Sequence, residues 1–373
     1  MVKNEALGPD QDRRGLRSDV ALAPLTSLEL GGAARYLAEI DDVRDAIEAI
    51  RWARGRREPI TVLGGGSNVV VADDGFRGLV LRAAMHGIDS RRDHDSVLVT
   101  AGAGENWDDL VADTVDRDLA GIECLSGIPG QVGATPIQNV GAYGQEVADV
   151  VEGVRVLDLE TLEEHTLSAE DCDFDYRNSV FRARPGRFLV LAVTFRLRPG
   201  GEPALRYKEL ERAMSIRYSS PTVADVREVV LELRWSKSMV LDLSDPNRRS
   251  AGSFFVNPVI GIEGLSAVSQ CGRATGVLQG DEQVPSFDIG GGHFKMSAGW
   301  LIEKAGFHKG IRRGLVGISS AHALALVNHG GGTAADLVAL AREIRDGVQR
   351  VFGIELRPEP VFVGFETDNP LDG

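Results

Sequence analysis

The 373-residue chain contains few cysteines and no recognisable metal-binding spacing. Its three cysteines, Cys124, Cys172 and Cys271, lie far apart in the sequence and form no CxxC pair. This argues against a disulfide framework and against a zinc site, and it is typical of proteins in a reducing cytoplasm. The seven histidines show neither HxxxH nor HExxH spacing. No metal site is therefore predicted.

Long apolar runs and an excess of positive charge are also missing. No stretch approaches the roughly 20 apolar residues that a membrane-spanning helix needs, so membrane insertion is not expected. Residues 1–19 lack the apolar block of a signal peptide and are expected to form a disordered leader. A formal net charge of −14 argues against nucleic acid as a partner, because phosphate backbones require a basic face.

An anionic small molecule remains compatible with this charge, because basic residues cluster locally. The clusters are Arg206 with Lys208, Arg234 with Lys237, and Arg248 with Arg249. For each cluster the alternative is an ordinary solvated surface charge.

Apolar spacing along the chain predicts an α+β protein. Residues 20–82 show a strand at 35–40, a helix after an Asp cap, and then strand, glycine loop, strand, turn and strand. Residues 83–238 show strands and helices around a long glycine-rich stretch, with a hairpin pattern at 151–168. Residues 239–353 close with a helix that Thr333 caps and Gly353 ends. Residues 354–366 are expected to add one strand to the second unit.

The first glycine-rich loop, "LGGGSN" (63–68), does not fit a Rossmann fingerprint. That fingerprint needs a glycine where this chain has Val69, followed by a helix, whereas "VVVADD" has the composition of a strand. Such a loop can still bind a phosphate through its backbone N–H groups. A tight hairpin without a ligand is the alternative. The second glycine-rich stretch, 121–147, lacks helical or strand periodicity but is too apolar for disorder, which favours an extended backbone lying against a flat cofactor.

The motifs "LGGGSN", "GAGENW" and "SGIPGQVGATPIQNVGAYG", in this order, resemble an FAD-binding domain of the vanillyl-alcohol-oxidase type, built from two α+β subdomains. From about residue 22 to 364 the chain resembles the UDP-N-acetylenolpyruvoylglucosamine reductase (UDP-N-acetylmuramate dehydrogenase) family. The resemblance implies two FAD-binding subdomains (20–82 and 83–238, the latter completed by 354–366) and a C-terminal α+β substrate-binding domain (239–353). It implies that non-covalent FAD binds at Gly64, Gly65, Gly66, Ser67, Asn68, Pro129, Gly130, Gly133, Ala134, Thr135 and Gly141.

The resemblance also implies an activity and its catalytic residues. NADPH reduces the flavin, which passes a hydride to the enolpyruvyl double bond of UDP-N-acetylglucosamine enolpyruvate, a step of cytoplasmic peptidoglycan precursor synthesis that supports cell shape and division. Arg177 in "FDYRNSVF" matches the family's arginine beside the developing enolate. Glu359 in "LRPEPV" matches the carboxyl group that helps to stabilise the intermediate, and Ser253 in "AGSFFVNP" matches the proton donor. A monomer is expected.

Substrate contacts are implied for Tyr143 in "GAYG", Tyr207 in "LRYKEL", Lys237 in "RWSK" and Asn257 in "VNP". Tyr207 resembles the loop tyrosine of one of the two family classes, which closes over the substrate diphosphate. One position departs from the pattern: Val256 stands where some members carry a lysine, which removes a cation from that place.

Two other functions are compatible with parts of this pattern. One is another FAD-dependent oxidase or dehydrogenase on the same fold, since a fold alone never fixes a function. The other is a non-enzymatic flavin or nucleotide-sugar sensor, although that function gives no reason to keep Arg177, Ser253 and Glu359 together. Without the family, these three residues have ordinary structural explanations: a capping arginine, a strand serine and a strand-edge glutamate.

Overall fold

The computed structural model of the chain describes residues 15–372. Its contacts divide these residues into two compact units, which are described separately below. The first unit comprises residues 15–21, 33–66 and 76–240, and the second comprises 22–32, 67–75 and 241–372. Within residues 15–372, no helix combines the length and the apolar character needed to cross a membrane.

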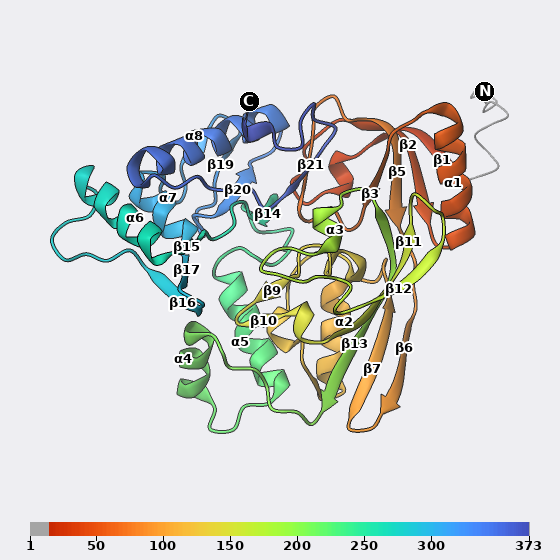
Figure 1. Cartoon of the computed structure of the whole chain (residues 1–373), viewed down its shortest axis with the longest axis horizontal. Helices are drawn as coiled ribbons and strands as arrows, with labels where there is room; N and C mark the ends of the chain where they lie inside the picture. Colours follow the sequence, from red (N-terminus) through yellow and green to blue (C-terminus); the bar gives the residue numbers. More distant parts are fainter. Residues whose placement is uncertain (1–14, 373) are drawn as a thin grey trace. The chain divides into compact units, whose positions relative to one another are not determined.

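The first unit begins with a four-stranded sheet in the order β1-β2-β5-β3. Its strands are β1 (Leu16–Ala21), β2 (Ala33–Ile40), β5 (Phe76–Ala83) and β3 (Ile60–Leu63). Strands β2, β5 and β3 run parallel, and β1 is antiparallel to β2. Helix α1 (Val43–Arg56) packs on this sheet (Figure 1), and the Asp42 carboxylate accepts a hydrogen bond from the Arg44 N–H at its start. This Asp cap confirms the predicted start of the helix.

A larger antiparallel sheet completes the first unit. Its main strands are β12 (Glu164–Ser168), β11 (Val151–Asp158), β13 (Phe188–Pro199), β7 (Ser96–Gly102) and β6 (Ile88–Asp93), and β8 (Leu119–Ala120) pairs with β13. Helices α2 (Trp107–Asp116), α3 (Val180–Ala183), α4 (Lys208–Arg217) and α5 (Val223–Trp235) belong to the same unit. The central strand β13 is nearly all apolar and is buried along most of its length, which explains its continuous apolar sequence.

The glycine-rich stretch from 121 to 147 forms only short elements, as its lack of periodicity predicts. These are the 3₁₀ helices η2 (Glu123–Leu125), η3 (Val132–Ala134) and η4 (Val147–Asp149), and the two-residue strands β9 (Gly141–Ala142) and β10 (Gln145–Glu146). Strands β9 and β10 pair antiparallel around a tight turn.

The second unit contains two larger sheets, besides a parallel pair of short strands that is described below. The first has the order β14 (Ser250–Ser253), β20 (Ala325–Asn328), β19 (Val316–Ile318) and β18 (Arg312–Arg313), and the second has the order β15 (Val259–Gly261), β17 (His293–Met296) and β16 (Ser286–Gly290). Helices α6 (Ile262–Ala274), α7 (Ala298–Lys304) and α8 (Ala334–Phe352) belong to this unit, which also holds the 3₁₀ helices η1 (Ala23–Leu25) and η5 (Pro370–Asp372). Thr333 and Asp336 form a capping box at the start of α8, and Gly353 ends it at φ 70°, as predicted.

The observed units differ from the expected boundaries in three places. Residues 1–14 of the expected leader, 1–19, lie outside the described residues. The remaining part does not fit the expectation, because Leu16 begins β1, which pairs with β2. The segments 22–32 and 67–75 were expected in the first FAD-binding subdomain, 20–82, but they belong to the second unit. Residues 354–366 also lie there, because their one strand, β21 (Val361–Val363), pairs in parallel with β4 (Val69–Val71).

Candidate active site

The three glycine-bearing motifs meet inside the first unit. A Cβ atom added to Gly65 would lie 2.9 Å from the Cα of Gly130, so the loop after β3 touches the long glycine-rich stretch where only hydrogen fits. The motif "GAGENW" joins them, because the Trp107 N–H donates to the Gly130 carbonyl at 3.1 Å and Asn106 bridges to Gln131. Glycines therefore bring the backbones of these three motifs into direct contact.

Gln131 lies at this junction and has one unsatisfied atom. Its Nε2 donates to the Gly104 carbonyl at 3.1 Å, whereas its buried Oε1 has no hydrogen-bond partner within residues 15–372. Buried polar atoms are nearly always paired, so an orphan of this kind points to a missing ligand or water. The glycine contact and this orphan acceptor both fit a bound FAD. The sequence interpretation missed Gln131, although it lies inside the quoted motif beside Gly130.

The other expected cofactor residues fall into two groups. Gly64, Pro129, Gly133, Ala134, Thr135 and Gly141 belong to the first unit, while Ser67 and Asn68 belong to the second. The Thr135 hydroxyl already donates to the Val132 carbonyl at 2.8 Å, so this bond fixes its rotamer. The Asn68 amide donates to the backbone carbonyl of Glu359 at 3.3 Å.

Arg177 occupies a strained and tightly held position in the first unit. Its φ is 55°, in the left-handed region that non-glycine residues seldom adopt. Its guanidinium donates to the Asn139 carbonyl at 3.3 Å and to the Gly141 carbonyl at 2.7 Å, and its Cζ lies 5.4 Å from the centroid of the Tyr176 ring. These contacts fix the orientation of the cation beside strand β9.

The Asn139 side chain links the glycine-rich stretch to the turn that carries Arg177. It is 1% exposed, and its Nδ2 donates to the Glu146 carboxylate at 2.7 Å and to the Asp175 carbonyl at 3.2 Å. Its Oδ1 accepts from the Ala148 N–H at 3.1 Å. All its hydrogen-bonding groups are therefore engaged, and they join the glycine-rich stretch to the turn that carries Arg177.

Tyr143, Tyr207 and Lys237 form one cluster in the first unit. The two tyrosine rings pack edge to face with centroids 5.6 Å apart, and the Lys237 Nζ lies 5.7 Å from the Tyr143 ring centroid. Lys237 also pairs with Glu209 at 2.7 Å. Burial raises the pKa of Tyr143 to about 12 and also raises that of Tyr207. Both phenols are thus neutral hydrogen-bonding groups at physiological pH.

Ser253 and Glu359 are held by main-chain contacts in the second unit. Ser253 ends β14 beside β20, after Gly252 at φ 69°. The Glu359 N–H donates to the Phe254 carbonyl at 2.9 Å, and Phe255 bridges to Pro358. Two segments that lie far apart in the sequence therefore place the serine and the glutamate on neighbouring stretches of backbone.

The flanking aromatic side chains anchor this region. Phe254 and Phe255 are each 1% exposed and belong to the core of the second unit. Asn257, which follows them, accepts a hydrogen bond from the Ala298 N–H at 2.9 Å, at the start of α7. Its amide oxygen is therefore already engaged within the unit.

The basic clusters noted in the sequence are mostly paired with acids. Arg206 pairs with Asp149 at 3.4 Å, and Arg248 and Arg249 both pair with Glu29. Burial raises the pKa of Glu29, but the two arginines lower it by more, so the net pKa lies below its usual value. These pairs attach residues 22–32 to the strand that leads to Ser253, a structural role that the sequence did not reveal.

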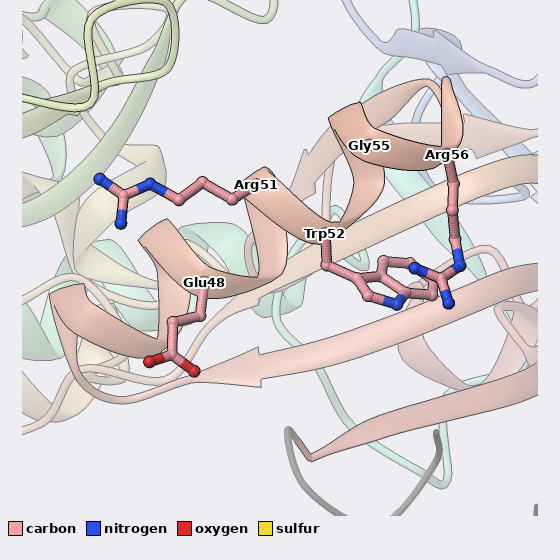
Figure 2. Close-up of a pocket in the computed structure, with 5 residues that line it drawn as sticks. All are labelled: Glu48, Arg51, Trp52, Gly55 and Arg56. Carbon is pink, nitrogen blue, oxygen red and sulfur yellow. The ribbon is translucent and has the colours of Figure 1, made fainter. Parts of the chain in front are cut away.

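A separate pocket lies on one face of α1 (Figure 2). It is lined by Glu48, Arg51, Trp52, Gly55 and Arg56, all from this helix. The Arg56 guanidinium lies 4.6 Å from the Trp52 ring centroid, and Trp52 packs edge to face on Tyr36. The pocket contains none of the predicted site residues. Within residues 15–372, no group of three His, Cys, Asp or Glu side chains is arranged to hold a metal ion.

Comparisons with known proteins match both halves of the chain. Residues 34–165 match an FAD binding domain family, and residues 245–363 match the C-terminal domain of UDP-N-acetylenolpyruvoylglucosamine reductase. The chain is 47% identical over 349 residues to the UDP-N-acetylenolpyruvoylglucosamine reductase of Thermobifida fusca, covering 93% of this chain and 97% of that protein. It is 48% identical over 350 residues to the reductase of the same name from Saccharopolyspora erythraea, covering 92% and 94%.

A solved structure resembles the whole fold. The crystal structure of UDP-N-acetylenolpyruvylglucosamine reductase (MurB) from Thermus caldophilus matches with a TM-score of 0.62 at 26% identity, covering 93% of this chain and 99% of that chain. The predicted fold class, α+β with an FAD-binding domain and a distinct C-terminal domain, is therefore confirmed, and so is FAD as cofactor.

Proposed function

The chain belongs to the UDP-N-acetylenolpyruvoylglucosamine reductase family, and we propose that it reduces UDP-N-acetylglucosamine enolpyruvate to UDP-N-acetylmuramate with NADPH as reductant. The observation that carries this proposal is the pair of matched segments. An FAD binding domain accounts for 34–165, and a C-terminal domain particular to this reductase accounts for 245–363. Another flavin oxidase on the same fold would explain the first segment but not the second.

FAD is assigned to the junction of the three glycine-bearing motifs, with Gly64–Gly66, Ser67, Asn68, Pro129, Gly130, Gly133, Ala134, Thr135 and Gly141 as its contacts. When bound, FAD supplies the chemistry of accepting a hydride from NADPH and giving it to a carbon of the substrate. The close approach of Gly65 to Gly130 and the orphan oxygen of Gln131 support this placement. The chain's own task there is to bind the dinucleotide through backbone N–H groups.

Arg177 is assigned to stabilise the negative charge that develops on the substrate carboxylate. A guanidinium is permanently charged and planar, so it suits a carboxylate, and its bonds to two backbone carbonyls keep it in one orientation. Preorganised charge of this kind is typically worth a few kcal/mol of barrier. Glu359, held between two prolines and bonded through its N–H to Phe254, is assigned to orient and stabilise the same intermediate.

Ser253 is assigned to deliver the proton that completes the reduction. Hydride addition at the methylene carbon of the substrate leaves the adjacent carbon to be protonated, and a hydroxyl can give that proton. Within residues 15–372 the Ser253 side chain makes no hydrogen bond of its own to another side chain, whereas its main chain is fixed by β14 and β20. The hydroxyl is thus free to rotate toward a substrate while its position stays fixed.

Tyr143, Tyr207, Lys237 and Asn257 are assigned to bind the UDP-sugar. The ring contact between the two tyrosines and the nearby Lys237 ammonium offer neutral donors and one cation, a set that suits a diphosphate. Val256 supplies no charge where some relatives carry lysine. A monomeric state and a cytoplasmic location remain predictions.

Visible absorption spectroscopy tests the proposal in one cuvette. We expect the purified protein to carry a flavin spectrum that NADPH bleaches without oxygen, and that the UDP-sugar enolpyruvyl ether then restores. A flavin that bleaches but is not restored would keep the cofactor and exclude the substrate. A protein that stays colourless after reconstitution with FAD would overturn the proposal.

A further inference from the structure

A carboxylate buried at the start of the glycine-rich stretch has no role in the chemistry above. Glu123 is 0% exposed. Its Oε2 accepts from the Gly121 N–H at 2.7 Å, and its Oε1 accepts from the Gln145 amide at 2.8 Å and from the Ala204 N–H at 2.9 Å. A buried carboxylate is unfavourable unless hydrogen bonds satisfy it, and all three of these donors are neutral.

The three donors come from segments that bear predicted site residues. Gly121 begins the stretch assigned to FAD, and Gln145 lies on β10, opposite Ala142 and two residues after Tyr143. Ala204 lies three residues before Tyr207, the residue that precedes α4. One carboxylate therefore joins the cofactor segment, the β9–β10 hairpin and the approach to α4.

Cys124 strengthens the same junction. Its N–H donates to the Gln145 Oε1 at 2.8 Å, and its thiol donates to the Ala204 carbonyl at 3.2 Å. Ala204 is thus held on both its N–H and its C=O sides. Cys124 also packs in an apolar cluster with Leu210 of α4 and Val226 of α5. The chain is fixed at Ala204, and the first residues beyond it lead directly to Tyr207.

We propose that Glu123 is a positioning residue for substrate binding, which fixes Ala204 so that Tyr207 lies against Tyr143. The rings meet edge to face with centroids 5.6 Å apart, and misplacement of a substrate-positioning group by about 1 Å can lower activity about 100-fold. Glu123 touches neither FAD nor substrate in this assignment. The inference rests on the proposed function, because it is that function which makes Tyr143 and Tyr207 substrate contacts.

The substitutions E123A and E123Q separate positioning from folding. E123A removes both acceptor oxygens and with them all three hydrogen bonds. We expect the KM for the UDP-sugar to rise about 10-fold or more, while the rate of flavin reduction by NADPH stays as in the wild type. E123Q keeps one oxygen that can still accept from Gln145 and Ala204, so its KM should lie between the KM of the wild type and that of E123A. This rescue by the conservative variant is not expected of a general loss of stability.

Asp158 provides the matched control. It is 5% exposed and likewise accepts two backbone hydrogen bonds, from Glu160 at 2.8 Å and Thr161 at 3.1 Å, with Arg187 as a third partner. It lies at the end of β11, and within residues 15–372 its side chain bonds to Glu160, Thr161 and Arg187 rather than to residues 202–207. D158A should lower the melting temperature as E123A does but leave KM unchanged. Equal KM changes in the two alanine variants would overturn the proposal.

Hydrogen–deuterium exchange gives a measurement that does not depend on turnover. Amides of residues 202–210 should exchange faster in E123A, and to a smaller extent in E123Q, than in the wild type or D158A. Unchanged exchange there would refute the positioning role even if E123A lost activity. If instead the wild type fails to reduce the UDP-sugar, the proposed function is wrong, while the exchange comparison still decides whether Glu123 holds this segment. Should E123A not fold, E123Q carries both measurements.

Discussion

The two units hold their predicted catalytic residues by different means. In the first unit, Arg177, Asn139 and Tyr143 all have φ values between 47° and 55°, a conformation that costs on the order of 1–3 kcal/mol for most non-glycine residues and less for asparagine. Such strain persists only where surrounding contacts over-determine it. Here the contacts are polar side-chain bonds, chiefly those of Asn139 and of the Arg177 guanidinium itself.

In the second unit, backbone hydrogen bonds hold the two predicted catalytic residues in place. Ser253 is fixed by the pairing of β14 with β20, and Glu359 by its N–H bond to Phe254. The side chains buried there, Phe254 and Phe255, are apolar anchors. The pairing of these segments is made by main-chain atoms, so it does not depend on the Ser253 hydroxyl.

This difference predicts which substitutions change only the reaction and which change the structure around a reactive group. In the second unit, removing a reactive side chain should leave the fold intact and change the reaction alone. In the first unit, removing a partner that touches no substrate should disturb the reactive group. Three substitutions test this contrast, in order of decreasing effect.

S253A should have the largest effect on turnover and almost none on folding. Loss of the hydroxyl removes the proposed proton donor, and general acid catalysis is typically worth about 10²–10⁴ in rate. We expect flavin reduction by NADPH to be unchanged and reoxidation by the UDP-sugar to slow by that factor, measured by anaerobic stopped-flow absorbance. The melting temperature should match that of the wild type.

Ser250 is the matched control for Ser253, since it lies at the other end of β14 and its hydroxyl accepts only a long bond, 3.4 Å, from the Gly252 N–H. S250A should keep normal turnover. If S253A turned over at a near-normal rate, Ser253 would not be the donor, and the contrast between the units would lose its clearest case.

N139D should have an intermediate effect, on both turnover and stability. The new carboxylate can still accept from Ala148 but cannot donate, and it would face the Glu146 carboxylate across the present 2.7 Å contact. We expect a loss of about 1–3 kcal/mol in the free energy of unfolding and a drop in turnover of about 10- to 100-fold through a displaced Arg177. Urea unfolding measures the free energy of unfolding, and steady-state kinetics measure the turnover.

N369D is the control for this substitution, because the Asn369 side chain acts as an acceptor for the Leu371 N–H and an aspartate preserves that role. It should change neither quantity. A variant N139D with wild-type turnover would show that Arg177 keeps its orientation without Asn139, and that side-chain bonds are less important in the first unit than the contrast implies.

Local patterns predicted much of the fold. The Thr333 cap and Gly353 stop of α8 and the 151–168 hairpin follow from short-range rules of capping and periodicity, and the structure contains them. The transfer of 22–32 and 67–75 into the second unit could not be predicted in this way. It depends on long-range pairs, such as β4 with β21 and Glu29 with Arg248, that leave no local signal.

The candidate site shows the same limit. The glycine loops are visible as short motifs in a single sequence, and the residues assigned to catalysis were predicted from the resemblance of such motifs to a known family. The positive φ of Arg177, the orphan oxygen of Gln131 and the three bonds of Glu123 are not visible there. Each depends on the three-dimensional surroundings of a residue whose type alone is unremarkable.

D108N should have the smallest effect, and a pH-dependent one. In the first turn of α2, Asp108 accepts from the Gly127 N–H at 2.6 Å and pairs with Arg227 at 2.6 Å. Burial raises the pKa of Asp108, but Arg227 and the Gly127 N–H lower it by more, so it lies below its usual value in the folded protein. The carboxylate therefore adds stability that is complete above the unfolded pKa of about 3.9 and is lost as the pH falls through the lower folded value.

An asparagine keeps an oxygen for Gly127 but cannot pair with Arg227. Because Asp108 is partly exposed, solvent screening limits the expected loss to about 1 kcal/mol at pH 7. The gap in melting temperature between the wild type and D108N should stay constant from pH 8 to about pH 5 and narrow below about pH 4, measured by thermal unfolding across that range. A gap that persists undiminished to pH 3 would mean that the lost packing of the side chain, not its charge, stabilises the segment at Gly127. In that case the Asp108 side chain would stabilise the first unit by packing, as Phe254 and Phe255 stabilise the second unit, and not by its charge.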